Sequence, residues 1–143
     1  MNSALEFIGK FYQAIMGKEV AAILDSYHIG DATYVILEGP RLSTKGYENI
    51  ASGWRDFCHS AIVLKSIEWL EGPFTFDMTD SATLAGVIRL QGNIGKDKTF
   101  DNTFRASFLL LKDQDSYKII HEHVSGALSD PYGIGDWKNQ IKD

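Results

Sequence analysis

The sequence predicts an α+β domain in which three N-terminal helices pack on a curved antiparallel sheet that forms a half-open cone. Apolar residues recur at helical spacing in the first part of the chain, but after His59 they alternate with polar residues as far as Ser125. The alternating segments are long and the turns between them are short, which favours antiparallel pairing of consecutive strands. A twisted sheet of such strands curls around its helices and leaves a cavity at the open end.

The first helix is predicted for residues 3–16. Ser3 and Glu6 form a capping box at its start, and Gly17 ends the apolar repeat. A short second helix follows over residues 19–25, and a third covers about 44–58. The third helix carries apolar residues at positions i, i+4, i+7 and i+8, which are Ile50, Trp54, Phe57 and Cys58.

A short strand rich in β-branched and aromatic residues is predicted between the second and third helices, over residues 32–37. Alternation then predicts the later strands at roughly 61–71, 74–79, 82–94, 99–112 and 116–125. Turn residues separate them, beginning with Glu71-Gly72-Pro73. We expect one domain over residues 1–128 and a C-terminal tail over 129–143.

Composition and charge exclude several classes of function. The chain has 143 residues and a net charge of −5, and it lacks the basic face typical of nucleic-acid binding. No segment approaches the ~20 apolar residues that a membrane span requires. Cys58 is the single cysteine, so no internal disulfide can form. We expect a cytoplasmic protein with no nucleic-acid or membrane partner and no cofactor.

The last strand carries the candidate catalytic residues, His121 and His123. Plain alternation places them on one face with Tyr117 and Ile119. Imidazoles at positions i and i+2 can transfer protons, bind a metal, or form ordinary hydrogen bonds in a pocket or interface. A metal would need a third protein ligand, so we expect no metal site. Ile120 and Val124 compete for the core and support the opposite arrangement, in which the histidines face a dimer contact.

The strand over residues 99–112 has two contrasting faces. We expect its apolar face, which includes Asn102, to be concave, and we predict that Tyr34, Trp54 and Asn102 bind a ligand there beside the histidines. The opposite, convex face would leave leucines in water and therefore predicts a homodimer. Its members are Thr103, Arg105, Ser107, Leu109 and Leu111.

The order of these elements and three short motifs resemble the SnoaL-like branch of the NTF2-like (ketosteroid-isomerase-like) superfamily. The motifs are Phe11-Tyr12 in the first helix, Lys45-Gly46-Tyr47 before the third, and the closing Tyr117-Lys-Ile-Ile-His-Glu-His-Val-Ser125. The resemblance covers roughly residues 3–125. No residue trio in the sequence stands out as the base, tyrosine and protonated aspartate of the steroid isomerases.

This resemblance implies a dimeric cone protein whose pocket binds a small hydrophobic molecule, such as a carbonyl or polyketide-like compound. It also implies acid/base activity of the isomerase, cyclase or dehydratase kind. The alternative is a non-catalytic ligand-binding or dimeric association module, because this fold hosts both enzymes and binding proteins.

Overall fold

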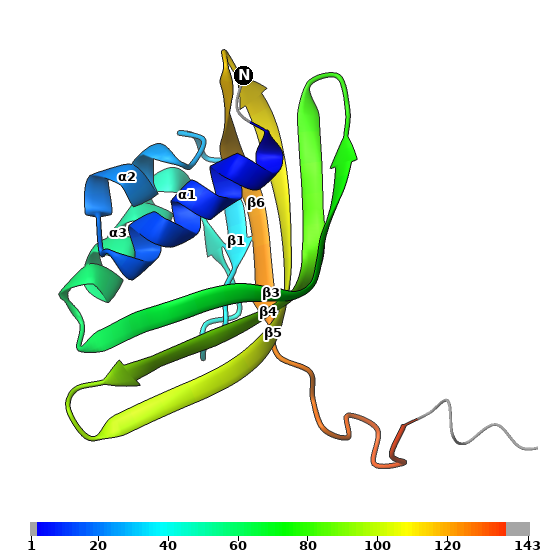
Figure 1. Ribbon diagram of the computed structural model, residues 1–143. Coiled ribbons are helices and arrows are strands. Elements are labelled where there is room, and N and C mark those ends of the chain that lie inside the picture. The colour runs from blue at the N-terminus through cyan, green and yellow to red at the C-terminus, as the bar shows by residue number, and fades with distance from the viewer. Residues whose placement is uncertain (1–2, 137–143) are drawn as a thin grey trace, which may run out of the picture.

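The computed structural model describes residues 3–136 and has the predicted α+β architecture, with helices covering one face of a curved, unclosed sheet (Figure 1). The helices are α1 (Ala4–Met16), α2 (Val20–Asp25) and α3 (Tyr47–His59). The strands are β1 (Tyr34–Ile36), β2 (Thr44–Lys45), β3 (Ile62–Asp77), β4 (Ser81–Ile94), β5 (Lys98–Asp113) and β6 (Ser116–Ser125). No helix among the described residues is long and apolar enough to cross a membrane.

Helix α1 forms because its cap and its apolar stripe agree. The Ser3 hydroxyl accepts a hydrogen bond from the Glu6 backbone N–H at 3.1 Å, as the capping box predicts. The stripe packs the helix onto the concave face of the sheet, where Ile8 and Phe11 are almost fully buried. The Phe11 ring makes edge contacts with Tyr27, Trp54 and Phe108. Through these rings the helix contacts the sheet, α3 and the residue Tyr27, which lies just after α2.

The six strands lie in the order β2-β1-β6-β5-β4-β3. The four strands after residue 60 pair antiparallel with their neighbours in sequence, as predicted. β1 is different, because it pairs with β6 in parallel, with Tyr34 opposite His121. The chain passes through α3 and four strands between β1 and β6, so no tight turn forces these two strands to run in opposite directions.

The turn predicted at Glu71-Gly72-Pro73 is wrong. β3 runs through these residues as one long strand with register irregularities around Lys65, Leu70 and Gly72. Such irregularities bend a strand and increase its twist. In Figure 1, β3, β4 and β5 bend midway and their lower ends extend beneath the helices. The sheet thereby forms the wall of the cone.

A β-bulge also interrupts β6. Leu109 pairs with His121 and Leu110 pairs with Ile119, which leaves Ile120 as an extra residue. The alternation predicted from the sequence holds as far as Ile119 and then changes phase. The side chains buried on the helix-covered face are Tyr117, Ile119, Glu122 and Val124.

The segment after β6 leaves the sheet (Figure 1). Residues 126–136 are exposed and form neither helix nor strand. Residues 137–143, the remainder of the predicted tail, lie outside the described residues, as do residues 1–2. The division into a domain and a tail stays a prediction.

Glycines in β4 let the bulged β3 approach closely, which yields a stability prediction. A Cβ at Gly86 would lie 2.2 Å from the Glu71 carbonyl oxygen, and one at Gly92 would lie 1.9 Å from that of Val63. We expect Gly86→Ala and Gly92→Ala each to lower the free energy of unfolding by about 1–3 kcal/mol, measured by urea denaturation. Gly9→Ala on α1 is the control, because a Cβ there meets nothing within 4 Å. It should raise stability by about 0.5–1 kcal/mol. Equal changes in the free energy of unfolding for the β4 variants and the α1 variant would contradict the close approach of β3 to β4.

Candidate functional site

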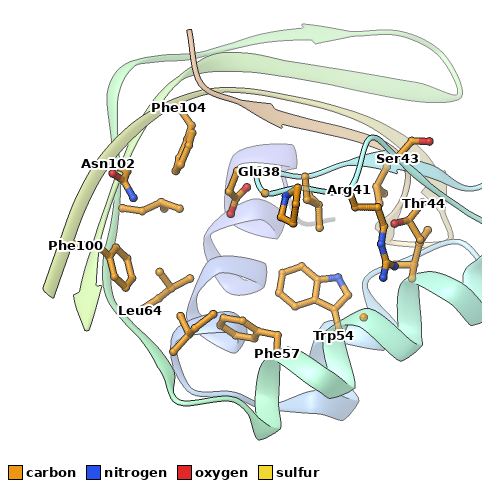
Figure 2. A pocket seen from close by; sticks show the side chains of 18 of the residues that line it. Glu38, Arg41, Ser43, Thr44, Trp54, Phe57, Leu64, Phe100, Asn102 and Phe104 are labelled. Atoms are coloured by element: carbon orange, nitrogen blue, oxygen red, sulfur yellow. The ribbon is translucent and has the colours of Figure 1, made fainter. Parts of the chain in front are cut away.

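A cavity of about 560 Å³ opens between α3, the segment after β1, and the concave face of β3, β4 and β5 (Figure 2). Apolar side chains form most of its wall, because every second residue of each strand faces inward. Its aromatic and aliphatic lining includes Leu37, Trp54, Phe57, Leu64, Leu90, Phe100 and Phe104. Its polar lining includes Glu38, Arg41, Ser43, Thr44, Asn49, Lys98 and Asn102.

Two of the predicted ligand-binding residues line this cavity, Trp54 from α3 and Asn102 from β5. Asn102 stands on β5 between Phe100 and Phe104, on the face that the sequence predicts to be concave. Its side-chain amide makes no hydrogen bond to any other residue of the described chain. It is therefore available to a ligand.

The structure places His121, His123 and Tyr34 away from the cavity. His121 and His123 pair with Leu109 and Ser107, which belong to the convex face of β5. The His121 ring stacks on the Tyr34 ring at a centroid distance of 5.9 Å, and its Nδ1 donates to the Tyr34 carbonyl at 2.8 Å. His123 Nε2 shares a hydrogen bond with the Ser125 hydroxyl.

The expected position of these three side chains is thus corrected. For the two histidines the physical reason is the bulge at Ile120, which reverses the faces of the residues that follow it. Tyr34 of β1 lies beside His121 because the two residues are paired in register. Among residues 3–136, no group of three or more His, Cys, Asp or Glu side chains is arranged to hold a metal ion. The catalytic roles of His121 and His123 and the ligand-binding role of Tyr34 stay predictions. Because these side chains lie on the convex face, any such role would be exercised there and not in the cavity.

The same bulge buries a carboxyl group, Glu122, which is 3% exposed. The Tyr27 hydroxyl donates to Glu122 Oε1 at 2.5 Å, and Trp54 Nε1 donates to the Tyr27 hydroxyl at 2.9 Å. Desolvation raises the pKa of Glu122 to about 8, although the Tyr27 hydrogen bond lowers it, and the nearby charge of Glu38 adds to the rise. Two hydrogen bonds therefore connect the buried Glu122 carboxyl group, which is mainly protonated at neutral pH, through the Tyr27 hydroxyl to the Trp54 indole in the cavity wall.

Glu38 supplies a second carboxyl group, and this one lies in the cavity itself. It follows β1, and Figure 2 shows its side chain among the lining residues, facing the interior. Glu38 keeps a large accessible area because the cavity is open, yet the surrounding wall removes much of the bulk water from its carboxylate. Desolvation raises the pKa of Glu38, while a hydrogen bond from its own backbone N–H lowers it.

Tyr12 of α1 lies close to both carboxyl groups. Desolvation, then the charges of Glu122 and Glu38, raise the pKa of its hydroxyl. The hydroxyl is buried and has no hydrogen-bond partner in the described part of the chain. A buried donor without an acceptor is unusual in a folded protein and marks a place where a ligand or water could accept a hydrogen bond.

Sequence reasoning missed this group of residues for separate reasons. Tyr12 stands in a helical apolar stripe and looks like an ordinary core residue. Glu38 precedes Gly39-Pro40, which signals only the end of a strand. Glu122 lies between the two histidines, where unbroken alternation assigns it to the wet face. The single signal that could have identified Glu122 is the competing apolar pair Ile120 and Val124.

Comparisons with known proteins establish the class of fold. The chain is similar to an NTF2-like superfamily protein from Salmonella enterica serovar Typhimurium, with a TM-score of 0.76, 18% identity and coverage of 91% of this chain and 92% of that chain. It is also similar to a ketosteroid isomerase-like protein from Erwinia carotovora atroseptica, with a TM-score of 0.67, 12% identity and coverage of 84% and 90%.

A third similar structure is a putative calcium/calmodulin-dependent protein kinase type II association domain from Thiobacillus denitrificans. Its TM-score is 0.70 at 15% identity, with coverage of 90% of this chain and 98% of that chain. No protein-family model and no curated protein sequence matches the chain. The protein therefore has the NTF2-like, ketosteroid isomerase-like cone fold, which confirms the predicted resemblance at that level. The SnoaL-like branch stays a prediction.

The raised pKa of Glu122 predicts how stability depends on pH. Its folded pKa of about 8 exceeds the ordinary value of 4.5, so between these values the folded state holds a proton that the unfolded state has released. The stabilisation of the folded state by protonated Glu122 is complete at low pH and is lost as the pH rises through about 8. The free energy of unfolding should fall by on the order of a few kcal/mol over this range.

Urea denaturation between pH 5 and pH 9 checks this prediction. The wild type should lose stability across the range, and Glu122→Gln, which can still accept from Tyr27, should lose much less. A parallel loss in both proteins would show that Glu122 does not titrate in this way.

Proposed function

We propose that the protein binds a small hydrophobic carbonyl compound in the cavity and transfers a proton at the carbon next to the carbonyl, as isomerases do. The observation that carries this proposal is the Glu38 carboxylate, whose pKa is raised within a largely apolar cavity. A titratable group perturbed by desolvation inside a concave site is a candidate for acid/base chemistry.

The shape and lining of the cavity support a ligand of this kind. A volume of about 560 Å³ suits a small organic molecule. The walls formed by Phe57, Phe100 and Phe104 would bury apolar surface, which is the main source of affinity for such a ligand. Asn102 offers its side-chain N–H groups to a carbonyl oxygen, and few other polar groups line this end of the cavity.

The proposed proton transfer needs a base and a hydrogen-bond donor. The Glu38 carboxylate removes a proton from the α-carbon, and the electron pair of the C–H bond moves toward the carbonyl oxygen. Asn102 donates to that oxygen as its negative charge develops. Glu38 then returns the proton to the substrate, so the step involves no net oxidation. Glu122, Tyr27 and Trp54 hold the cavity wall rigid through their hydrogen bonds.

The alternative function is a dimeric association or ligand-binding module, and a separate observation supports the dimer. Strand register aligns two rows of side chains across the convex face. One row is Phe76, Thr83, Leu109, His121 and Tyr34, and the other is Phe74, Ala85, Ser107, His123 and Ile36. Phe76 and Phe74 are 60% and 55% exposed, and an apolar strip of this kind favours burial against a second copy of the chain. The stacked His121 and Tyr34 rings would then lie in the contact.

Replacement of Glu38 tests the proton-transfer proposal. We expect the wild type to accelerate exchange of α-protons for deuterium in a panel of small cyclic ketones, measured by NMR. Glu38→Gln should slow this exchange by about 10²-fold or more, because the amide cannot act as the base. Binding of the neutral dye Nile red, the control, should remain. Exchange at the same rate in both proteins would contradict the role of Glu38, and dye binding without exchange in the wild type would favour the binding module.

Replacement of Leu109 tests the dimer. Light scattering of the wild type should give twice the chain mass of 16.0 kDa at micromolar concentration. Leu109→Lys should give a monomer, because it places a charge at the centre of the apolar row. Leu5→Lys is the matched control, since Leu5 is an exposed leucine on α1. A wild-type monomer, or dissociation by both variants alike, would reject the convex-face dimer.

A further inference from the structure

We propose that the ligand of the cavity carries an anionic group, such as a carboxylate, which Arg41 binds at one end while the apolar body of the ligand lies at the other. This inference rests on the proposed ligand-binding function and narrows the ligand to an amphiphilic acid. Two observations carry it, the polarity gradient along the cavity and the absence of a protein partner for the Arg41 guanidinium.

The two ends of the cavity differ in chemistry (Figure 2). At one end, the segment between β1 and α3 contributes Arg41, Ser43 and Thr44, and α3 adds Asn49. At the other end, the strands contribute the apolar groups Leu64, Phe100 and Phe104, with the Asn102 amide between the two phenylalanines and Lys98 at the start of β5. A purely apolar ligand would leave the first end unused, whereas a molecule with a polar head and an apolar body would match both.

The Arg41 guanidinium has no hydrogen-bond or ion-pair partner among residues 3–136. Two of the chain's other cations behave differently, since Arg89 pairs with Asp101 and Lys118 pairs with Asp25. Arg41 is exposed, so water solvates its guanidinium, and no carboxylate of the described residues competes with a ligand for it.

A carboxylate is the group that this end of the cavity fits best. The guanidinium presents N–H donors in a planar fork that matches the two oxygens of a carboxylate. The Thr44 hydroxyl lies beside the Arg41 side chain at the same end (Figure 2) and can donate a further hydrogen bond to an anion. Such a charge-assisted contact is worth more than a neutral hydrogen bond and fixes the orientation of the ligand. The carbonyl would then be presented between Glu38, in the middle of the cavity, and Asn102, which stands at the aromatic end.

A matched pair of probes tests this inference. 4-Phenylbutanoate and its neutral amide have the same apolar body and differ in the charge of the head group. We expect calorimetry at fixed ionic strength to show that the wild type binds the acid about tenfold or more tightly than the amide, a difference of about 1.4 kcal/mol. Arg41→Gln should remove this preference and leave the affinity for the amide unchanged. Unchanged amide binding also shows that the variant folds.

Lys98→Gln is the control for simple charge attraction. Lys98 lines the same cavity but lies at the start of β5, two residues from Phe100. Its removal changes the net charge as the Arg41 variant does, and it should preserve the preference for the acid. An equal loss in both variants would overturn the assignment to Arg41. Equal binding of acid and amide by the wild type would overturn the inference and leave the proposed function standing. Binding of neither probe would contradict both.

Discussion

The bulge at Ile120 determines which side chains of the last strand face the helices. Tyr117 and Ile119 point inward before it, and Glu122 and Val124 point inward after it. Without the extra residue, His121 would occupy the inner face and Glu122 would stand in water. The bulge instead brings a carboxyl group to the Tyr27 hydroxyl, and through Tyr27 it anchors the Trp54 indole in the cavity wall.

The shape of the cavity comes from the curvature of the sheet, and its polar groups come mainly from the segment after β1. The bulged β3 and the glycines that receive it bend the sheet beneath the helices, so the strands wall off a space that a flat sheet would leave open. The loop after β1 then supplies the polar groups on the opposite side. Glu38 stands between the cationic end at Arg41 and the aromatic end at Phe100, and desolvation of its carboxylate follows from that position.

The fold and one wall of the cavity could be predicted from the sequence, because they depend on local periodicity. Helical spacing identified α1 and α3, and alternation along β5 correctly assigned Asn102 to the concave face and Leu109 to the convex one. The phase change in β6 could not be predicted in this way. Ile120 is apolar, so the sequence fits a strand with a bulge at Ile120 as well as a strand without one. The burial of Glu122 also depends on Tyr27, which is distant in sequence.

The direct test of this account is a ¹³C NMR titration of the side-chain carboxyl groups of Glu122 and Glu38, without ligand and with a bound small carbonyl compound. We expect Glu122 to titrate at about 8, Glu38 to titrate above its ordinary value, and the Glu38 resonance to move when the compound binds. Titration of both groups near their ordinary value of 4.5, with neither resonance responding to the compound, would contradict the inward placement of Glu122 and the assignment of the cavity as the functional site.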